Sequence, residues 1–371
     1  MGEAPLERRR LLTLSIPSTS PGQRFRIQAW APHLARHGIE NTELPFASPR
    51  LENLLGQPGH VPAKLVHTVH SYACYAASRP DPAAYDLFFV HREATPFGPP
   101  LRERWIRRRS PAGFVLDIDD PLFIPETRSP TPFARVLRVG DKWKRLCDLA
   151  DVTLCINEEI AAAISPCCRR VEIVPNALDL EQYPRRPSAP DTERPVLGYS
   201  GSHSTLPELL VIQNALRRLA REREVALHVL GGAAPFSIDG VKTIQHPWTP
   251  ESEVRLLHQF IVGLAPAADT EYNRHKEFVK ILLYMAVGLP VVASPVGSSA
   301  RVIRHGVNGF LATSDDEWVE ILRLLLSDSD LCLRIGSAAR QTVEEDYALA
   351  RHLPRIIRLF SDLARRADDA L

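Results

Sequence analysis

The sequence has 371 residues, which is too long for one ordinary hydrophobic core and fits two domains of about 150 to 190 residues each. Hydrophobic residues make up 44% and charged residues 24% of the chain, which is typical of a globular protein and excludes a disordered one. The formal net charge of +1 argues against a general nucleic-acid binder, so any charged ligand must be bound locally.

Targeting and redox signals are weak in this sequence. No apolar run approaches the roughly 18 residues that span a bilayer, and the N-terminus, MGEAPLERRR, lacks the apolar segment of a signal peptide. The six cysteines form no C-x-x-C pair, and the adjacent Cys167 and Cys168 are poorly suited to a disulfide framework. We therefore expect a cytoplasmic protein with reduced, mostly structural thiols.

Short apolar runs separated by helix-sized segments recur along the chain, which predicts an α/β protein with parallel strands and crossover helices. In the first half they occupy residues 11–16, 87–90, 114–118, 152–156 and 171–174. In the second half they occupy residues 196–199, 226–230, 241–244, 261–265, 290–293 and 310–312. A stretch rich in Pro, Arg and Asp lies between the two series. We predict a first domain over 1–183, a linker over 184–195, a second domain over 196–351 and an amphipathic helix over 352–371.

The most informative segment, residues 269–311, reads as a polar loop, a helix, a Gly-Leu-Pro break, a short strand and a turn. We expect Lys276 and Lys280 one turn apart on one face of this helix, near an N-terminus whose free N–H groups also favour an anion. Such an arrangement suits a diphosphate, although a solvated helix face is the alternative for both lysines. The turn that follows the strand supplies Gly297, Ser298 and Ser299.

Residues 284–293, YMAVGLPVVA, resemble the donor-binding segment of the family 4 retaining glycosyltransferases, and the resemblance covers nearly the whole chain. It implies the GT-B architecture, in which two Rossmann-like parallel-sheet domains face a central cleft and the last helix, here 352–371, returns to the N-terminal domain. It also implies that a sugar is transferred from a nucleoside diphosphate-sugar without a metal or another cofactor.

A polar turn, residues 198–208 (GYSGSHSTLPE), follows the first strand of the second domain. Gly201 lets the backbone approach a ligand, and Thr205 with Glu208 has capping-box spacing, which predicts a helix start. From the segment alone, an ordinary capped turn is the alternative. The resemblance implies donor binding instead, since a Gly-Ser-x-Ser-Thr turn occurs here in one branch of the family. The hydroxyls available for this are those of Ser202, Ser204 and Thr205.

The sequence departs from the family at two glutamates that commonly lie near the donor sugar and the ribose. Counted from the Tyr-Met-Ala anchor, these positions hold His275 and Leu283. Leucine accepts no hydrogen bond, so ribose recognition falls to Glu277 or a backbone carbonyl, or donor binding is weakened or lost. Relatives often carry Arg and Lys near the first turn, and this chain lacks both there. Phosphate neutralisation therefore falls to the two lysines and Arg274.

Polar residues also follow the strands of the first domain, at the edge where a ligand would lie. Arg24 and Arg26 follow the first strand and are candidates to contact the acceptor or the donor phosphates, with a surface turn as the alternative for Arg24. His91 and Arg92 end another strand and read as polar lining of the cleft. These four are our acceptor-side candidates.

The sequence Asp117-Ile118-Asp119-Asp120 closes the 114–118 strand with a spacing that suits a divalent cation. The resemblance implies no metal and places the donor in the second domain. We therefore predict that Asp119 and Asp120 make polar contacts near the reacting sugar or the acceptor hydroxyl.

Together these features predict a retaining glycosyltransferase that moves a hexose-like sugar to a glycan, a lipid-linked sugar or a small molecule. Two alternatives stay open: a nucleotide-sugar 2-epimerase with the same architecture, and a degenerate paralogue that binds a nucleotide-sugar or a partner without turnover. The basic stretch 101–109, LRERWIRRR, reads as a solvated helix face or as a peripheral contact with an anionic membrane. No nucleic-acid partner is expected.

Overall fold

The computed structural model describes residues 8–17, 21–55, 57, 59–124, 140–187, 195–232 and 234–368. They form two compact units, which we describe separately. The first unit consists of residues 1–55, 59–177 and 352–371, and the second consists of residues 56–58 and 178–351.

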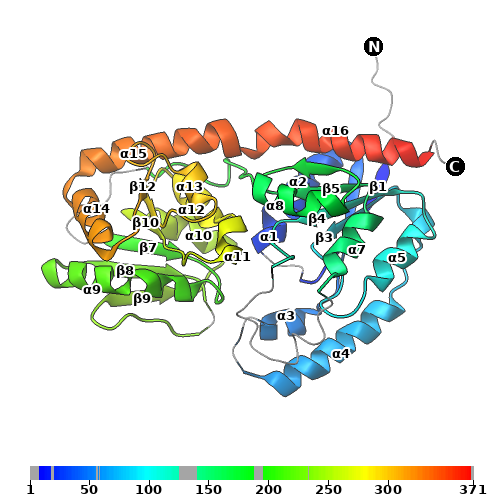
Figure 1. Ribbon diagram of the computed structural model, residues 1–371, viewed down its shortest axis with the longest axis horizontal. Coiled ribbons are helices and arrows are strands. Elements are labelled where there is room, and N and C mark those ends of the chain that lie inside the picture. The colour runs from blue at the N-terminus through cyan, green and yellow to red at the C-terminus, as the bar shows by residue number, and fades with distance from the viewer. Residues whose placement is uncertain are drawn as a thin grey trace, which may run out of the picture. The chain divides into compact units, whose positions relative to one another are not determined.

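The first unit contains a six-stranded parallel sheet with the order β2-β1-β3-β4-β5-β6 (Figure 1). The strands are β1 (Arg9–Ser15), β2 (Ile39–Pro45), β3 (Leu87–His91), β4 (Gly113–Ile118), β5 (Val152–Cys155) and β6 (Val171–Ile173). Five of them confirm the predicted runs. The sequence pattern does not predict β2, because this edge strand, IENTELP, buries only Ile39 fully and so lacks an apolar run.

Helices cover both faces of this sheet. They are α1 (Pro21–Arg24), α2 (Ile27–Arg36), α3 (Pro49–Leu55), α4 (Val61–Ala77), α5 (Leu101–Arg107), α7 (Lys142–Leu149) and α8 (Glu158–Ile164), with 3-10 turns at Pro82–Ala84 and Ser165–Cys167. On one face, Trp30 of α2 packs edge-on against Phe89 of β3 and against Phe360, which belongs to α16 (Leu349–Asp368). Leu146 of α7 and Ile160 of α8 belong to a hydrophobic core cluster that includes Phe88 of β3.

The second unit repeats the plan with the strand order β12-β11-β10-β7-β8-β9. Its strands are β7 (Val196–Ser200), β8 (Ala226–Leu230), β9 (Lys242–His246), β10 (Val262–Ala265), β11 (Val291–Ala293) and β12 (Phe310–Leu311), and all six confirm predicted runs. Its helices are α9 (Gln213–Glu222), α10 (Pro250–Leu257), α11 (Glu271–His275), α12 (Val279–Ala286), α13 (Ser299–Val302), α14 (Asp315–Ser327) and α15 (Ser329–Thr342), with a 3-10 helix at Leu206–Ile212 and a π-helical turn at Val343–Tyr347.

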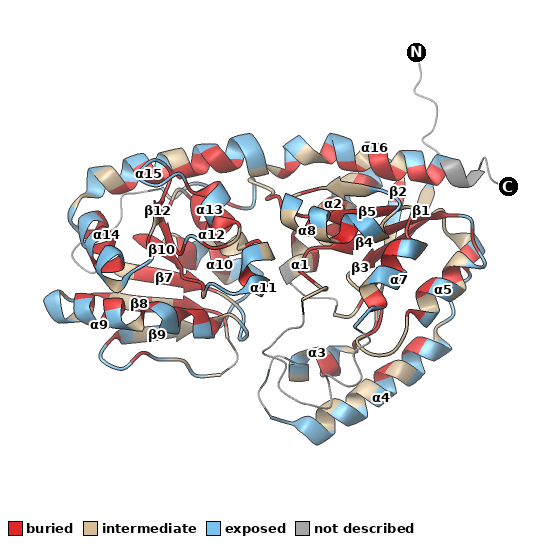
Figure 2. Cartoon of the chain, in the orientation of Figure 1, coloured by how far each residue is buried: buried red, intermediate tan, exposed pale blue. Residues whose placement is uncertain are grey.

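Two glycines, in the buried strands β7 and β10, let large aromatic side chains lie directly on the second sheet (Figure 2). A Cβ added to Gly198 would lie 1.8 Å from the Phe260 ring, and one added to Gly263 would lie 2.4 Å from the Tyr284 ring. Glycine is needed here for close approach rather than for a special backbone angle. The Tyr284 hydroxyl then accepts a 2.6 Å hydrogen bond from the Ser200 N–H, at the carboxyl end of β7.

The predicted linker is corrected for residues 184–187, which pack on the second unit. The Arg186 N–H donates to the Val287 carbonyl at 3.0 Å, and its guanidinium donates to the Phe260 carbonyl at 2.8 Å. Because Arg186 bonds to the second unit, residues 184–187 are part of that unit, although their Pro- and Arg-rich composition resembles that of a solvated linker. The second unit begins at residue 178, and residues 188–194 of the predicted linker lie outside the described residues.

The helix α16 begins in the second unit, but the residues from His352 onward belong to the first. Its apolar side includes Phe360, which is fully buried. Among the helices in the described part of the chain, none combines the length and apolar composition that a membrane span requires.

Candidate functional site

Each sheet has one place where the strand order reverses. In the second unit the strands run outward from β7 through β8 to β9, and the chain then crosses to β10 on the other side of β7. In the first unit the same reversal lies between β1 and β3. Loops leave such a switch point in opposite directions and open a ligand site beyond the carboxyl ends of the strands. The predicted site residues follow these strands.

Lys280 lies at the switch point of the second unit. Its ammonium nitrogen is 3.7 Å from the centre of the Tyr199 ring, which lies near the end of β7. Although the side chain as a whole is only half-buried, its ammonium is densely surrounded, and burial lowers the pKa of Lys280 well below its usual value. The nearby positive charge of Lys276 lowers this pKa further, and Glu208 opposes the shift. The site therefore holds a cation whose charge is poorly compensated.

The prediction that Lys276 and Lys280 share one helix is wrong. The helix α11 ends at His275, Lys276 is extended with ψ of 146°, and α12 begins only at Val279. The turn after β11 keeps the backbone between α11 and α12 non-helical, because the Phe278 N–H donates to the Ser298 hydroxyl at 2.8 Å. The two lysines are nevertheless close enough for the charge of one to lower the pKa of the other.

The capping box predicted for Thr205 and Glu208 is also wrong. Thr205 precedes the 3-10 helix Leu206–Ile212 without capping it through its side chain. Glu208 is buried, and its carboxylate accepts hydrogen bonds from the Ala268 N–H at 2.7 Å and from the Asn273 amide at 3.2 Å. Glu208 thus ties the loop after β10 to the loop after β7. No sequence signal distinguished it from an ordinary acidic residue in a first helical turn.

The turn after β7 presents its hydroxyls at the surface. Ser202 and Ser204 are exposed, and their oxygens lie 3.0 Å apart. Gly201 is required by packing, because an added Cβ would lie 2.5 Å from the Thr205 hydroxyl oxygen. The Tyr199 hydroxyl fixes the end of the turn by donating to the Thr205 carbonyl at 2.5 Å.

The turn Gly297-Ser298-Ser299 shapes the site through its backbone. Gly297 has φ of +58°, and an added Cβ would lie 2.3 Å from the Asn273 carbonyl oxygen. The hydroxyls of Ser298 and Ser299 are buried and bond to the backbone, with Ser299 donating to the Val296 carbonyl at 2.5 Å. These serines, predicted to bind the donor, hold the loop that carries Lys276.

The remaining predicted donor contacts bond within their own segment. Arg274 forms a bidentate ion pair with Asp269, with nitrogen–oxygen distances of 2.6 and 2.9 Å, and both side chains are exposed. The His275 ring nitrogen Nδ1 lies 2.9 Å from the Glu271 carbonyl oxygen. Leu283 is only 4% exposed and lies in a stretch of α12, residues 281–286, that is buried on all sides, so this position does not face a ribose.

In the first unit a buried ion pair lies behind the switch point. Arg26 is fully buried, and its Nε lies 3.1 Å from each oxygen of Asp117. Asp117 also lies 3.0 Å from Nδ1 of His91, and because a carboxylate only accepts, this nitrogen carries the proton. Arg26, predicted on the acceptor side, therefore lies beneath the surface and orders the cluster. Arg24 is half-buried, with its guanidinium 4.8 Å from the Phe25 ring centre.

Arg92 joins the two remaining carboxylates. Its guanidinium donates to both oxygens of Asp119, at 2.5 and 2.8 Å, and pairs with Asp120 at 2.5 Å. Burial alone would raise the pKa of Asp119, but the charge of Arg92, which donates to both of its oxygens, holds that pKa below its usual range. Arg92 has φ of +60°, a left-handed conformation that is uncommon outside glycine and often marks a functional site.

The second ring nitrogen of His91, Nε2, makes no hydrogen bond within this cluster. Its Nε2 is buried and has no hydrogen-bond partner among the residues that the structure describes; it lies 3.7 Å from Asp119. The backbone of Gly22 covers this group, since an added Cβ would lie 2.3 Å from Asp119 and 3.0 Å from His91 Nε2. With Nδ1 donating to Asp117, Nε2 is free to accept a hydrogen bond from a hydroxyl.

Residues 194–328 match the model of the family described as Glycosyl transferases group 1. No curated protein sequence matches the chain. The structure is similar to sucrose-phosphate synthase from Thermosynechococcus elongatus, with 14% identity, 96% of this chain and 99% of that chain covered, and a TM-score of 0.70.

Two further solved structures are similar over nearly the full length. HepE from Anabaena, solved in complex with UDP-glucose, has 17% identity, with 96% of this chain and 100% of that chain covered and a TM-score of 0.65. A glycosyltransferase from Rickettsia africae has 12% identity, with 96% and 98% covered and a TM-score of 0.63. These likenesses confirm the predicted GT-B fold.

Replacing Leu283 by Glu should destabilise the second unit by about 3 kcal/mol or more, because a carboxylate would be buried without a partner. Leu324→Glu is the matched control, since Leu324 on α14 is 45% exposed, and it should change stability by no more than about 0.5 kcal/mol. Thermal unfolding of both variants measures the difference. An unchanged melting temperature for Leu283→Glu would place this side chain on the ligand side.

Lys280 should make stability depend on alkaline pH. Its pKa is lower in the folded protein than the usual 10.5, so between these two values the unfolded chain binds more protons. The free energy of unfolding should therefore rise with pH in that window, by up to about 1.4 kcal/mol per pH unit. Lys280→Met should remove this rise, whereas Lys242→Met, at an exposed position of β9, should keep it. Urea denaturation at several alkaline pH values tests this, and equal slopes in the two variants would contradict it.

Proposed function

Since residues 194–328 match the model of the glycosyl transferases group 1 family, we propose that the protein is a retaining glycosyltransferase that uses a nucleoside diphosphate-sugar without a metal. The observation that carries this proposal is the pair of lysines at the switch point of the second unit. HepE, a protein of the same fold, was solved with UDP-glucose, so a UDP-sugar is the donor to test first. A cytoplasmic location stays part of the proposal.

Lys280 is the group that we assign to the leaving diphosphate. When the bond between sugar and phosphate lengthens, negative charge grows on the phosphate oxygens, and an ordered cation stabilises it. Burial makes the charge of Lys280 unfavourable in the absence of an anion, as its lowered pKa indicates. A bound diphosphate supplies the missing partner and raises this pKa, so the attraction is strongest when the leaving group is most negative.

His91 is the group that we assign to the acceptor. The Asp117 carboxylate favours the tautomer in which Nε2 accepts. Because Nε2 is buried beneath Gly22, we propose that the Gly22 backbone moves aside before His91 orients an acceptor hydroxyl and takes up its proton. Arg92 and Asp119 hold the adjoining loop in place. The acceptor is a glycan, a lipid-linked sugar or a small molecule.

The alternative of a degenerate, non-catalytic paralogue rested on Leu283 and His275. Because Leu283 is part of the core, its lack of a carboxylate no longer argues for a damaged donor site. Glu277, which is buried and follows Lys276, is the carboxylate that we propose for the ribose hydroxyls.

Lys280→Ala should lower turnover of a UDP-sugar by about a hundredfold or more, because it removes a cation from the developing diphosphate charge. The fold should persist, since a poorly compensated charge is removed. Lys242→Ala, which removes an exposed lysine of the same unit, is the control and should keep full activity. Single-turnover release of UDP measures the effect, and wild-type turnover in Lys280→Ala would refute the assignment.

Treatment with a chelator should leave activity unchanged within about twofold, because the charges that meet the diphosphate are proposed to come from side chains. Asp117 and Asp119, whose spacing suits a metal, are each engaged by a guanidinium. The test is UDP-sugar turnover before and after EDTA and after adding magnesium or manganese. Loss in EDTA with recovery on adding either ion would instead make these two carboxylates metal ligands.

A further inference from the structure

The turn after β3 carries two residues of the proposed acceptor site, His91 and Arg92, and its backbone is strained. We call residues 91–97 the β3 turn. Arg92 has φ of +60°, a left-handed conformation that residues with a side chain seldom adopt. Such a conformation persists where the surrounding structure fixes the backbone next to it. On the side of the sheet β4 does this, because the Arg92 N–H donates to the Asp117 carbonyl at 2.7 Å.

Beyond Arg92, two buried side chains from different helices bind the backbone of the β3 turn. The Ala94 N–H donates to Oε1 of Glu103, on α5, at 3.1 Å. The ammonium of Lys142, on α7, donates to the Thr95 carbonyl at 2.5 Å and to the Thr95 hydroxyl at 3.2 Å. Glu103 and Lys142 are only 0% and 4% exposed, so these bonds are shielded from water. Consecutive residues of the turn are therefore held from two helices.

A third helix holds the end of the turn. The Tyr72 hydroxyl, on α4, donates to the Phe97 carbonyl at 2.8 Å and accepts from the Phe97 N–H at 3.1 Å. Burial raises the pKa of Tyr72, which keeps this hydroxyl protonated and able to donate. One side chain therefore satisfies both backbone groups of Phe97. We call Tyr72, Glu103 and Lys142 the clamp.

The clamp contains charges whose burial is costly. Burial raises the pKa of Glu103, and the charge of Lys142 opposes this shift. Oε2 of Glu103 is buried and has no hydrogen-bond partner among the residues that the structure describes. Lys142 also pairs with Glu93 at 3.1 Å, so one buried cation interacts with two carboxylates. Buried ion pairs add little stability compared with apolar side chains of similar size, so we attribute these charges to fixing the polar backbone of the turn.

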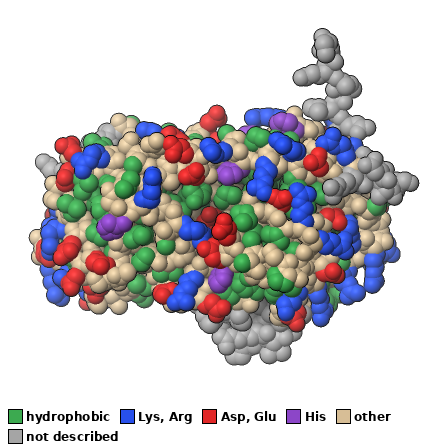
Figure 3. Space-filling model, turned by 45° about the horizontal axis from the view of Figure 1, so that its top comes forward, with side chains coloured by type: hydrophobic (Ala, Val, Ile, Leu, Met, Phe, Trp, Pro, Cys, Tyr) green, Lys and Arg blue, Asp and Glu red, His purple; other side chains and the backbone are tan. Residues whose placement is uncertain are grey.

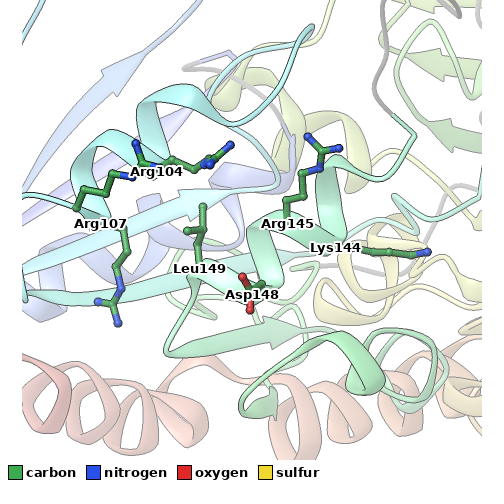
Figure 4. A pocket seen from close by; sticks show the side chains of 7 residues that line it. Arg104, Arg107, Lys144, Arg145, Asp148 and Leu149 are labelled. Atoms are coloured by element: carbon green, nitrogen blue, oxygen red, sulfur yellow. The ribbon is translucent and has the colours of Figure 1, made fainter.

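The outer sides of α5 and α7 are both cationic. Lys and Arg side chains gather at the right-hand end of Figure 3, the end at which α5 lies in Figure 1. A pocket of about 460 Å³ lies between the two helices (Figure 4). Its lining includes one carboxylate, Asp148, and five cations: Arg104, Arg107, Arg108, Lys144 and Arg145. Like charges favour separation of the helices, and the attraction between Glu103 and Lys142 on their buried sides opposes it.

We propose that Tyr72, Glu103 and Lys142 are positioning residues. The clamp holds the β3 turn so that His91 and Arg92 keep the orientation that the acceptor requires. Its side chains act through the backbone of the turn rather than on a substrate. Because a misplacement of about 1 Å at a group that orients a reactant can lower turnover about a hundredfold, loosening the turn affects the rate. This inference rests on the function proposed above and extends it to residues behind the site.

Release of UDP from UDP-glucose, with water in place of the acceptor hydroxyl, tests the clamp. Glu103→Leu should lower kcat per folded molecule about tenfold or more, because the Ala94 N–H loses its acceptor. Glu103→Gln keeps a carbonyl oxygen at this place and should stay within about threefold of the unmodified protein. The KM for UDP-glucose should change by no more than about twofold in either variant, since the donor is assigned to the second unit.

Hydrogen exchange of residues 92–97 is the second measurement, and it needs no turnover. Tyr72→Phe removes one hydroxyl and leaves the buried charges intact, so the variant should fold. Exchange should become at least about tenfold faster in it, because the Phe97 N–H loses its acceptor, and kcat should fall about tenfold. Tyr85→Phe is the matched control, since Tyr85 is a half-buried tyrosine that packs near Phe88 of the same unit. Neither exchange nor kcat should change in Tyr85→Phe.

The two measurements separate this inference from the proposed function. Unchanged exchange in Tyr72→Phe would overturn the clamp, and so would faster exchange with an unchanged kcat. An equal loss of kcat in Glu103→Gln and Glu103→Leu would also contradict it, because the hydrogen bond to Ala94 would not be responsible. If the unmodified protein releases no UDP, the proposed function fails, and the exchange rates alone then decide whether the clamp holds the β3 turn.

Discussion

A charge buried in a protein needs a partner, and this constraint orders the switch points of both sheets. In the first unit the partner of Asp117 is Arg26, which also donates to the Val174 carbonyl after β6. In the second unit the Glu208 carboxylate binds the loop after β10. Each carboxylate joins segments that are distant in sequence, so charge-assisted hydrogen bonds hold these loops in place.

Lys280 is the exception to this constraint, and the exception points to function. Structural lysines at a surface keep their ammonium in water, whereas Lys280 holds it over the Tyr199 ring and beside another lysine. An aromatic face only partly replaces water around a cation. Such an arrangement persists when a ligand completes it, which is why pKa values shifted by burial concentrate at functional sites.

The sequence was sufficient to predict the layers and most strands, because strands that helices cover read as apolar runs, whereas β2, IENTELP, has no such run. The site was harder to predict. The break between α11 and α12 depends on Ser298 and on the Gly297 backbone, more than 15 residues further along, so a helical pattern over 271–286 concealed it. Glu208 looked like a capping residue because local spacing does not reveal that its partners, Ala268 and Asn273, lie 60 or more residues away.

The same distinction explains Leu283. Counting from a motif assigns a position along the chain, but the burial of that position depends on how the helix packs in the folded unit. In α12 the six residues from Ile281 to Ala286 are all buried, so Leu283 is part of the core whichever side of the helix it occupies. His91 was identified as polar lining, but its fixed tautomer follows from Asp117 on the neighbouring strand, a contact made only by the parallel register of β3 and β4.

The helix α16 places a restriction on biosynthesis. Phe360 completes an aromatic cluster with Trp30 and Phe89, which belong to the earliest part of the chain. During translation, residues near the N-terminus leave the ribosome long before residue 360 does. The face of the first sheet that contains Phe89 therefore lacks the contact with Phe360 until the second unit has been synthesised. The elements of the second unit, by contrast, lie in one continuous stretch from β7 to the start of α16. A ribosome that stalls within α16 would therefore expose the core of the unit it made first.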